Sequence, residues 1–298
     1  PKMFAGSRYA DRLPIGKEDI LKNFKYDAIK RFYKDWYRPD LMAVAVVGDV
    51  DVAEMERLVK SHFEKLKQPA SPRPRQLADV PVRTKSEGIV VTDKEATNHV
   101  VEIHYSYKKA KEEITIGDYR DHLIRNLVTS MLSQRMQELT QSAEPPFIFG
   151  GTFIGGYARG FEAVQSVGYV SKAGVETALS ALIEENERMR KFGFTPGELE
   201  RTKKNMMKRM ERAFNERDKT ESADLIEEYI RHFLEHEPIP GIENEFSYYK
   251  QYLEGISLEE VNRFAAALMP AADDHKLVVL TGPDQAEFKI PAHDELLA

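Results

Sequence analysis

Apolar residues recur at helical spacing in two N-terminal segments, with an apolar stretch between them. Residues 27–37 repeat pairs of apolar side chains at helical spacing, and Pro39 ends that helix because the residue before a proline is pushed out of the α region. Residues 41–47 are apolar at successive positions, which predicts a central β-strand covered on both faces. Asp51, with Glu54 three positions later, is then expected to cap a second helix.

A proline-rich stretch interrupts these patterns. Residues 67–84 contain four prolines and almost no periodicity, which is typical of a semi-rigid spacer. We therefore predict the C-terminal part of a first domain in residues 1–68, a linker in 69–84 and a second domain in 85–298.

The second domain alternates strand and helix patterns. Capping boxes at Thr195 and Ser257 mark two helix starts. Strands are expected over 88–93, 98–107, within 147–171 as a pair, and over 276–281; helices are expected over 115–140, 174–191, 195–217, 221–236 and after 257. The arrangement predicts the α+β class, with mixed or antiparallel sheets packed against helices in two layers.

The two ends of the chain repeat one order of features. The segment RFYKDWYRPDLMAVAVVGDVDV at 31–52 contains a helix, a proline turn, an apolar strand and a glycine, and residues 263–282 show the same order. We interpret this echo as one kind of half-domain used twice.

Composition narrows the class of protein. A chain of 298 residues favours two domains, and 42% hydrophobic with 31% charged residues indicates a soluble globular protein. The net charge of −6 argues against nucleic acid as the main partner, and no apolar run could span a membrane. The basic stretch 201–217 also contains Glu and Met, so we interpret it as a solvated helix face. A start at Pro1, with no signal peptide, suggests an excised piece of a longer protein.

One short motif suggests metal chemistry. His232-Phe233-Leu234-Glu235-His236 is an H-x-x-E-H string, which in zinc peptidases places two histidines on one helix face. Here it ends a helix two residues before Pro238, where ligand geometry would fray. We favour solvent-side histidines that meet the C-terminal end of the helix dipole, with a metal held by His232 and His236 as the alternative.

The remaining chemical candidates form no catalytic constellation. Cysteine is absent, which excludes thiol nucleophiles, disulfides and cysteine–zinc sites. Gly48-Asp49 lacks dinucleotide-binding spacing, and Ser166 has no adjacent base pattern. The glycines at 150, 151, 155, 156 and 160 are expected to permit tight strand turns or close backbone approach. We therefore predict no catalytic and no metal-ligating residue, and assign no substrate-binding residue.

Several segments carry a family resemblance. FAGSRYADRLPIG together with FYKDWYRPDLMAVAVVGDVD, the run Met131–Arg135, GGYARGFEAVQSVGYV and EHEPIPGIENE resemble the pitrilysin/insulinase family of zinc peptidases, which includes mitochondrial processing peptidase and bacterial zinc proteases. The resemblance implies the LuxS/mitochondrial-processing-peptidase-like metallohydrolase fold, with homologous domains joined by a linker. In that family the zinc ligands precede the FAGSRYADRLPIG-like segment, so zinc is expected in the intact parent protein, none in this fragment, and no ligand role for His232 or His236.

The resemblance also bears on substrate contact. Family members use a second-domain Arg and Tyr to contact the substrate backbone; Thr140 stands where the Arg is expected, and Phe147 or Phe149 where the Tyr is expected. This departure argues against direct substrate contact at these positions.

The function implied is the C-terminal, substrate-chamber portion of a zinc-dependent metalloendopeptidase that hydrolyses peptides, inactive by itself. The alternative is a non-catalytic partner or scaffold subunit of a peptidase pair, as a homodimer or heterodimer within the same family. The expected location is the periplasm or the cytoplasm of a bacterium.

Overall fold

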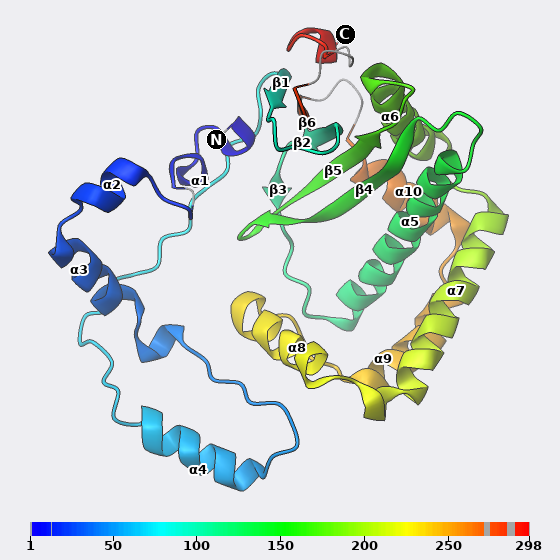
Figure 1. Cartoon of the computed structure of the whole chain (residues 1–298). Helices are drawn as coiled ribbons and strands as arrows, with labels where there is room; N and C mark the ends of the chain where they lie inside the picture. The colour runs from blue at the N-terminus through cyan, green and yellow to red at the C-terminus, as the bar shows by residue number, and fades with distance from the viewer. Residues whose placement is uncertain (1, 13, 271–274, 285–289, 298) are drawn as a thin grey trace.

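The computed structural model describes residues 2–12, 14–270, 275–284 and 290–297. The chain has an elongated N-terminal arm and a body built on a sheet (Figure 1). The arm contains the 3-10 turns η1 (Lys2–Phe4) and η2 (Pro39–Leu41) and the helices α1 (Arg8–Asp11), α2 (Glu18–Asn23), α3 (Tyr26–Trp36) and α4 (Val52–Phe63). The body begins at β1 (Glu87–Thr92).

The two helices predicted in the arm are confirmed, but the strand between them is wrong. Asp51 caps α4 by accepting a hydrogen bond from the Glu54 amide at 2.7 Å. Residues 42–47 form no strand, and Met42, Val44 and Val46 are 44%, 48% and 48% exposed. A central strand needs neighbours on both sides. The strands of the body all pair with one another, and no described strand pairs with this segment.

The body contains one six-stranded sheet. Its strands are β1, β2 (Val100–Tyr105), β3 (Lys108–Lys109), β4 (Phe147–Ala158), β5 (Phe161–Val170) and β6 (Lys276–Gly282). The order is β1-β6-β2-β5, with both β3 and β4 paired to β5. Only the β1–β6 pair is parallel. The predicted α+β class with a mixed sheet is confirmed.

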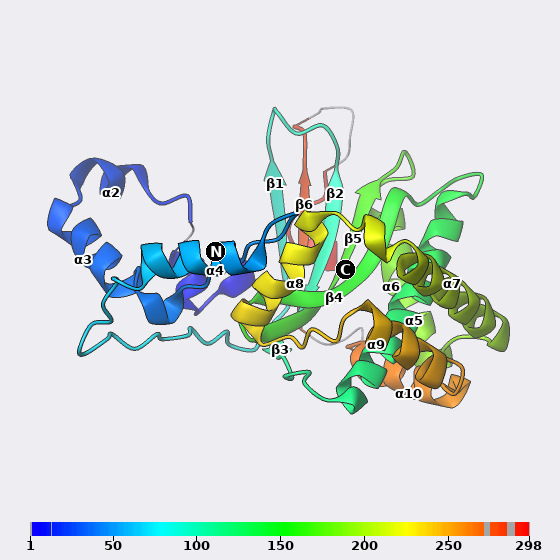
Figure 2. The same ribbon diagram turned by 90° about the horizontal axis from the view of Figure 1, so that it is seen from below.

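The helices of the body, apart from α8, gather on one side of the sheet (Figure 2). The helices of the body are α5 (Ile116–Thr140), α6 (Val175–Phe192), α7 (Pro196–Asn215), α8 (Ser222–Glu235), α9 (Ile242–Tyr248) and α10 (Leu258–Leu268), with the turns η3 (Arg217–Lys219), η4 (a π-helix, Tyr249–Leu253) and η5 (Glu295–Leu297). Val101 and Ile103 of β2 pack with Leu127 of α5 and Leu182 of α6 in the main core, which confirms the two-layer prediction. Helix α8 projects away from this layer (Figure 1).

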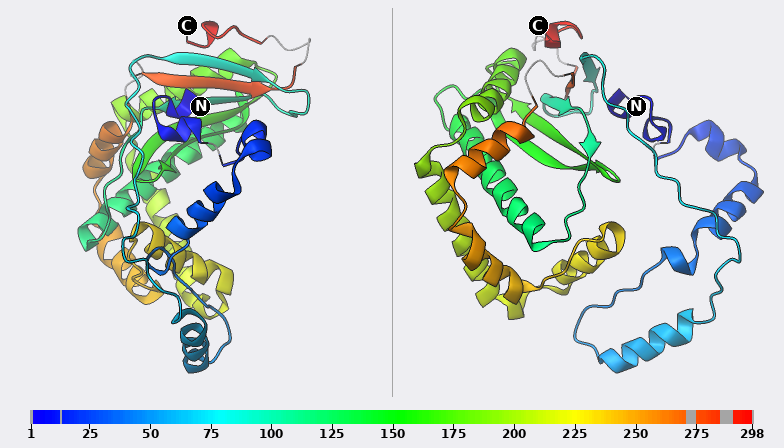
Figure 3. Two further views of the ribbon diagram at one scale, coloured as in Figure 1. Left: turned by 90° about the vertical axis from the view of Figure 1, so that its left-hand side faces the viewer. Right: turned by 180° about the vertical axis from the view of Figure 1, so that it is seen from behind.

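The start of the arm covers part of the opposite sheet face. Met3, Phe4 and Tyr9 pack against a small core that includes Tyr107 and Phe161. The phenyl ring of Phe4 stacks on Tyr107 with ring centroids 5.3 Å apart. Figure 3 shows the first turns of the chain, in dark blue, beside the sheet, and Lys2 of η1 pairs with Glu87 of β1 at 3.3 Å.

The proline-rich segment contains no helix or strand and packs back onto α3. Arg73 pairs with Asp35 at 3.1 Å, and its guanidinium lies 5.5 Å from the ring centroid of Trp36. Arg38 donates to the Arg73 carbonyl at 2.7 Å. These contacts hold the proline-rich segment against α3. The predicted division into two domains stays a prediction.

The repeated order of features predicted at the two ends of the chain is observed only in part. Both copies contain a helix, since α3 and α10 are observed. Strand β6 is a central strand between β1 and β2, whereas its counterpart in the arm is unpaired. The turn between α10 and β6 lies partly outside the described residues, and the half-domain interpretation stays a prediction.

Candidate functional site

An outer edge of the sheet is open along β4. This twelve-residue strand pairs with β5 on one side, and the described residues include no strand on its other side. Alternate N–H and C=O groups of an edge strand point outward and can pair with another extended chain. The β4 edge is therefore able to accept a further strand.

A hollow of about 480 Å³ runs beside this edge, between β4 and α5. Thr129, Ser133 and Gln137 of α5 recur every four residues and so form one polar stripe along the helix. The full lining is Thr129, Ser130, Ser133, Gln134, Gln137, Thr152, Phe153, Ile154 and Arg209. The apolar stripe of α5 was evident in the sequence, but its second, polar face was not assigned a role.

A closed polar network fixes β4 at the hollow. Asn186 of α6 donates to the Ser166 hydroxyl of β5, the Thr152 hydroxyl donates to the Asn186 side-chain oxygen, and the two hydroxyls share a third hydrogen bond, each at 2.8 Å. All three residues are buried. A buried network in which every side chain has its hydrogen-bond partners fixes the positions of those side chains. Ser166 therefore has a structural role here and lacks the surroundings of a nucleophile.

The beginning of β4 is set by an aromatic–glycine contact. Phe147 is fully buried, and a Cβ on Gly150 would lie 2.4 Å from its ring. Only glycine allows that ring to lie over the strand, which confirms the predicted close approach at this position. The register shifts between Phe147 and Phe149, so Phe149 turns to the opposite face and meets Tyr169 edge-on with ring centroids 5.9 Å apart.

A second hollow, of about 290 Å³, adjoins the first. Its lining is Asn126, Ser130, Met206, Arg209, Met210, Ala213 and Tyr249. Ser130 and Arg209 line both hollows. Burial raises the pKa of Tyr249, and Glu245 raises it further while Arg209 opposes the shift, so the phenol stays protonated at neutral pH.

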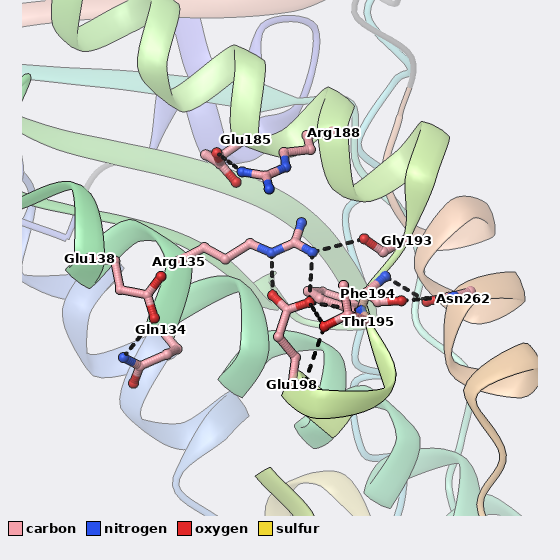
Figure 4. Close-up of polar contacts among 10 residues, drawn as sticks. All are labelled: Gln134, Arg135, Glu138, Glu185, Arg188, Gly193, Phe194, Thr195, Glu198 and Asn262. Carbon is pink, nitrogen blue, oxygen red and sulfur yellow. Dashed lines mark hydrogen bonds and ion pairs between the residues drawn. The ribbon is translucent and has the colours of Figure 1, made fainter. Parts of the chain in front are cut away.

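An ion pair between the buried Arg135 and the partly buried Glu198 joins α7 to α5 (Figure 4). Arg135 donates from Nε to Glu198 Oε1 at 2.6 Å and from Nη2 to Glu198 Oε2 at 3.0 Å and to the Gly193 carbonyl at 2.9 Å. Glu198 also completes the predicted capping box with Thr195. Burial raises the pKa of Glu198, but hydrogen bonds from Arg135 and Thr195 outweigh it and lower the pKa to about 2.

The loop between α6 and α7, whose Gly193 carbonyl accepts from Arg135, is also joined to α10. Asn262 of α10 accepts from the Phe194 amide at 2.8 Å and donates to the Phe194 carbonyl at 3.3 Å (Figure 4). Gly193 has φ +66°, and a Cβ there would lie 2.4 Å from the Asn262 side chain. Contacts from α5 and α10 thus hold the start of α7, the helix that carries Arg209.

The H-x-x-E-H string does not present two histidines on one helix face. His232 lies in the last turn of α8, and its Nδ1 is 2.8 Å from the Glu237 carbonyl. His236 lies beyond the helix end in the left-handed region, with φ 62°. In the described ranges, no group of three or more His, Asp or Glu side chains could hold a metal ion.

The positions matched to the family's Arg and Tyr are separated in the structure. The Thr140 hydroxyl donates to the Gln137 carbonyl at 2.7 Å and ends α5. Phe147 belongs to the core, whereas Phe149 is 48% exposed.

No helix in the described part of the chain is long and apolar enough to cross a bilayer.

The chain is similar in sequence to zinc proteases over most of its length. The chain is 32% identical over 268 residues to the zinc protease PQQL-like of Arabidopsis thaliana, covering 89% of this chain and 25% of that protein. It is 26% identical over 288 residues to the probable zinc protease PqqL of Haemophilus influenzae, covering 94% of this chain and 30% of that protein. The chain thus spans about a quarter to a third of these relatives.

Solved structures show the same fold. The periplasmic protease PqqL of Escherichia coli superposes on the whole chain with a TM-score of 0.84 and 20% identity, over 33% of its own length. Its first half superposes on 95% of this chain with a TM-score of 0.82, over 60% of that half. Residues 23–206 match the family described as the peptidase M16 inactive domain. The chain therefore belongs to the M16 family of zinc peptidases, as the resemblance to the pitrilysin/insulinase family implied, and it contains that family's inactive domain.

Proposed function

We propose that this chain forms part of the wall of a peptide-binding chamber in a zinc-dependent metalloendopeptidase. The observation that carries the proposal is the open edge of β4 beside the polar stripe of α5. An extended peptide can add to such an edge through main-chain hydrogen bonds, while its side chains enter the adjacent hollow. The chain would then bind substrate without cleaving it.

Zinc belongs to this proposal through the intact parent protein. The relatives from Arabidopsis and Haemophilus are named zinc proteases. A zinc ion acts in peptide hydrolysis as a Lewis acid and as a source of activated water, and it needs three protein ligands with an open position. We propose that these ligands lie outside this chain, and that the purified chain shows no chelator-sensitive peptide cleavage.

Two further proposals concern context. We propose a bacterial location, periplasmic or cytoplasmic, and the periplasmic E. coli relative supports the periplasm.

We also propose pairing with a second chain of the same family. The apolar side chains on α8 support this pairing, since Tyr229 and Phe233 are 50% and 41% exposed; analytical ultracentrifugation of a Tyr229→Lys, Phe233→Lys variant tests it.

Peptides methylated on backbone nitrogens test the β4 proposal. A bound strand directs every second N–H toward β4, so N-methylation at those residues removes hydrogen bonds, and methylation at the intervening residues leaves them intact. Fluorescence anisotropy of a labelled decapeptide with the purified chain should show about threefold to tenfold weaker binding for each bond removed in one methylation set. Equal affinities for the two sets would contradict strand addition.

A further inference from the structure

The two hollows beside β4 and α5 share one charged residue. Arg209 lines both, and no other lining residue of either hollow carries a charge. The remaining polar groups there are hydroxyls and side-chain amides, together with the Tyr249 phenol. A guanidinium in such surroundings is suited to bind a carboxylate, because hydroxyl and amide N–H groups can supply further hydrogen bonds.

Arg209 is not engaged by the protein itself. Within the described residues it makes no hydrogen bond and no ion pair. Two other cations of α7 do: Arg212 pairs with Glu216 at 3.0 Å, and Lys203 donates to the Glu254 carbonyl at 2.8 Å. Glu245 acts on Tyr249 but lines neither hollow. Arg209 is therefore available to a ligand.

Strand addition would bring a side chain to this guanidinium. Thr152 and Ile154 of β4 lie opposite the buried Ser166 and Val164 of β5, on the face that meets the helices. Side chains of an added strand alternate between the same two faces. Every second residue of a bound peptide would thus point toward α5 and α7, where Ser130 and Arg209 lie between the hollows.

We propose that Arg209 makes this groove selective for peptides with a carboxylate on the helix-facing side, over Ser130. The inference rests on the proposed peptide binding along β4 and adds the substrate class. The carboxylate can be an Asp or Glu side chain or a peptide C-terminus. The basic stretch 201–217 would then have two roles, since most of it is solvated and Arg209 serves recognition.

Matched peptides test the proposal by fluorescence anisotropy with the full chain. The probes are labelled decapeptides of alternating threonine and valine with a single Glu, Gln or Lys at the fifth or sixth position, C-terminally amidated, and a Gln peptide with a free C-terminus. We expect the Glu peptide to bind about twofold to fivefold more tightly than the Gln peptide in one of the two registers. Preference for the free C-terminus in place of the Glu would identify the terminal carboxylate as the ligand.

Variants assign the preference to Arg209. In Arg209→Gln the Glu and Gln peptides should bind equally, and in Arg209→Glu the Lys peptide should bind best. Arg212→Gln, on the same helix but outside both linings, should keep the wild-type ratio. Arg209 is exposed, so circular dichroism should show all three variants folded. The ratio should also fall as salt is raised, because mobile ions screen an exposed charge pair.

The outcomes separate this inference from the peptide-binding proposal. If all peptides bind equally well to the wild-type chain, or if the Glu preference survives in Arg209→Gln, the carboxylate selectivity is wrong, and the N-methylated peptides decide separately whether binding occurs along β4. If no peptide binds, both proposals are wrong.

Discussion

The Arg135–Glu198 junction predicts a pH-dependent loss of stability in one variant. Replacing Glu198 with Gln removes the charge that two Arg135 nitrogens contact at 2.6 and 3.0 Å, and leaves a buried guanidinium without its counter-ion. The pKa of Glu198 is lowered from its ordinary value of 4.5 to about 2. At about 1.4 kcal/mol for each pH unit, the ionised carboxylate contributes about 3 kcal/mol at pH 7.

The sign of the pH dependence follows from the lowered pKa. Because the folded pKa lies below the unfolded one, the contribution is complete above about pH 4.5 and disappears as the pH falls through about 2. At pH 3 about 1 kcal/mol should remain. Glu198→Gln should therefore lose about 3 kcal/mol relative to the wild type at pH 7 and about 1 kcal/mol at pH 3.

Urea unfolding followed by far-UV circular dichroism is the assay. Trp36, the single tryptophan, lies in α3, so fluorescence reports on the arm and serves as an internal reference. Glu200→Gln is the matched control, because Glu200 is exposed on the same helix and lies 4.0 Å from Lys203. If Glu198→Gln proves as stable as Glu200→Gln at pH 7, or loses the same free energy at both pH values, the reasoning is refuted.

Two predictions concern the stability of β4. Thr152→Val should cost about 1–3 kcal/mol in urea unfolding, because Asn186 and Ser166 lose a hydrogen-bonding partner in the core; an unchanged midpoint would show that the network contributes nothing. Phe147→Ala should cost about 3–5 kcal/mol, since the ring is fully buried, whereas Phe149→Ala should cost about 1 kcal/mol or less. Equal losses for the two phenylalanines would contradict their placement on opposite faces.

Local signals made most of the fold predictable. The capping boxes at Thr195 and Ser257 depend on residues within one turn, and both form as expected. The stretch 41–47 misled because an apolar run indicates burial without showing that neighbouring strands are present. The π-helix at Tyr249–Leu253 was not predicted, since its hydrogen-bond pattern has no distinctive spacing of apolar residues.

The candidate site was less accessible to sequence reasoning. The hollow requires the polar face of α5 to meet β4, and neither segment reveals that contact alone. Thr129, Ser133 and Gln137 were a signal that could have been read, because residues four apart on a helix share one face. Arg209 carried no such signal, since nothing in its local sequence distinguishes it from neighbouring Lys208 and Arg212.

The unpaired stretch 42–47 also has a consequence for behaviour in solution. Met42 has an extended backbone, no described strand pairs with the segment, and its apolar side chains at 42, 44 and 46 are nearly half exposed, which are properties of a segment on which chains stack into intermolecular sheets. Pro39 and Asp40 precede it, and Asp49 and Asp51 follow it. Proline and like charges beside an apolar segment oppose stacking, so these flanking residues act as gatekeepers against aggregation.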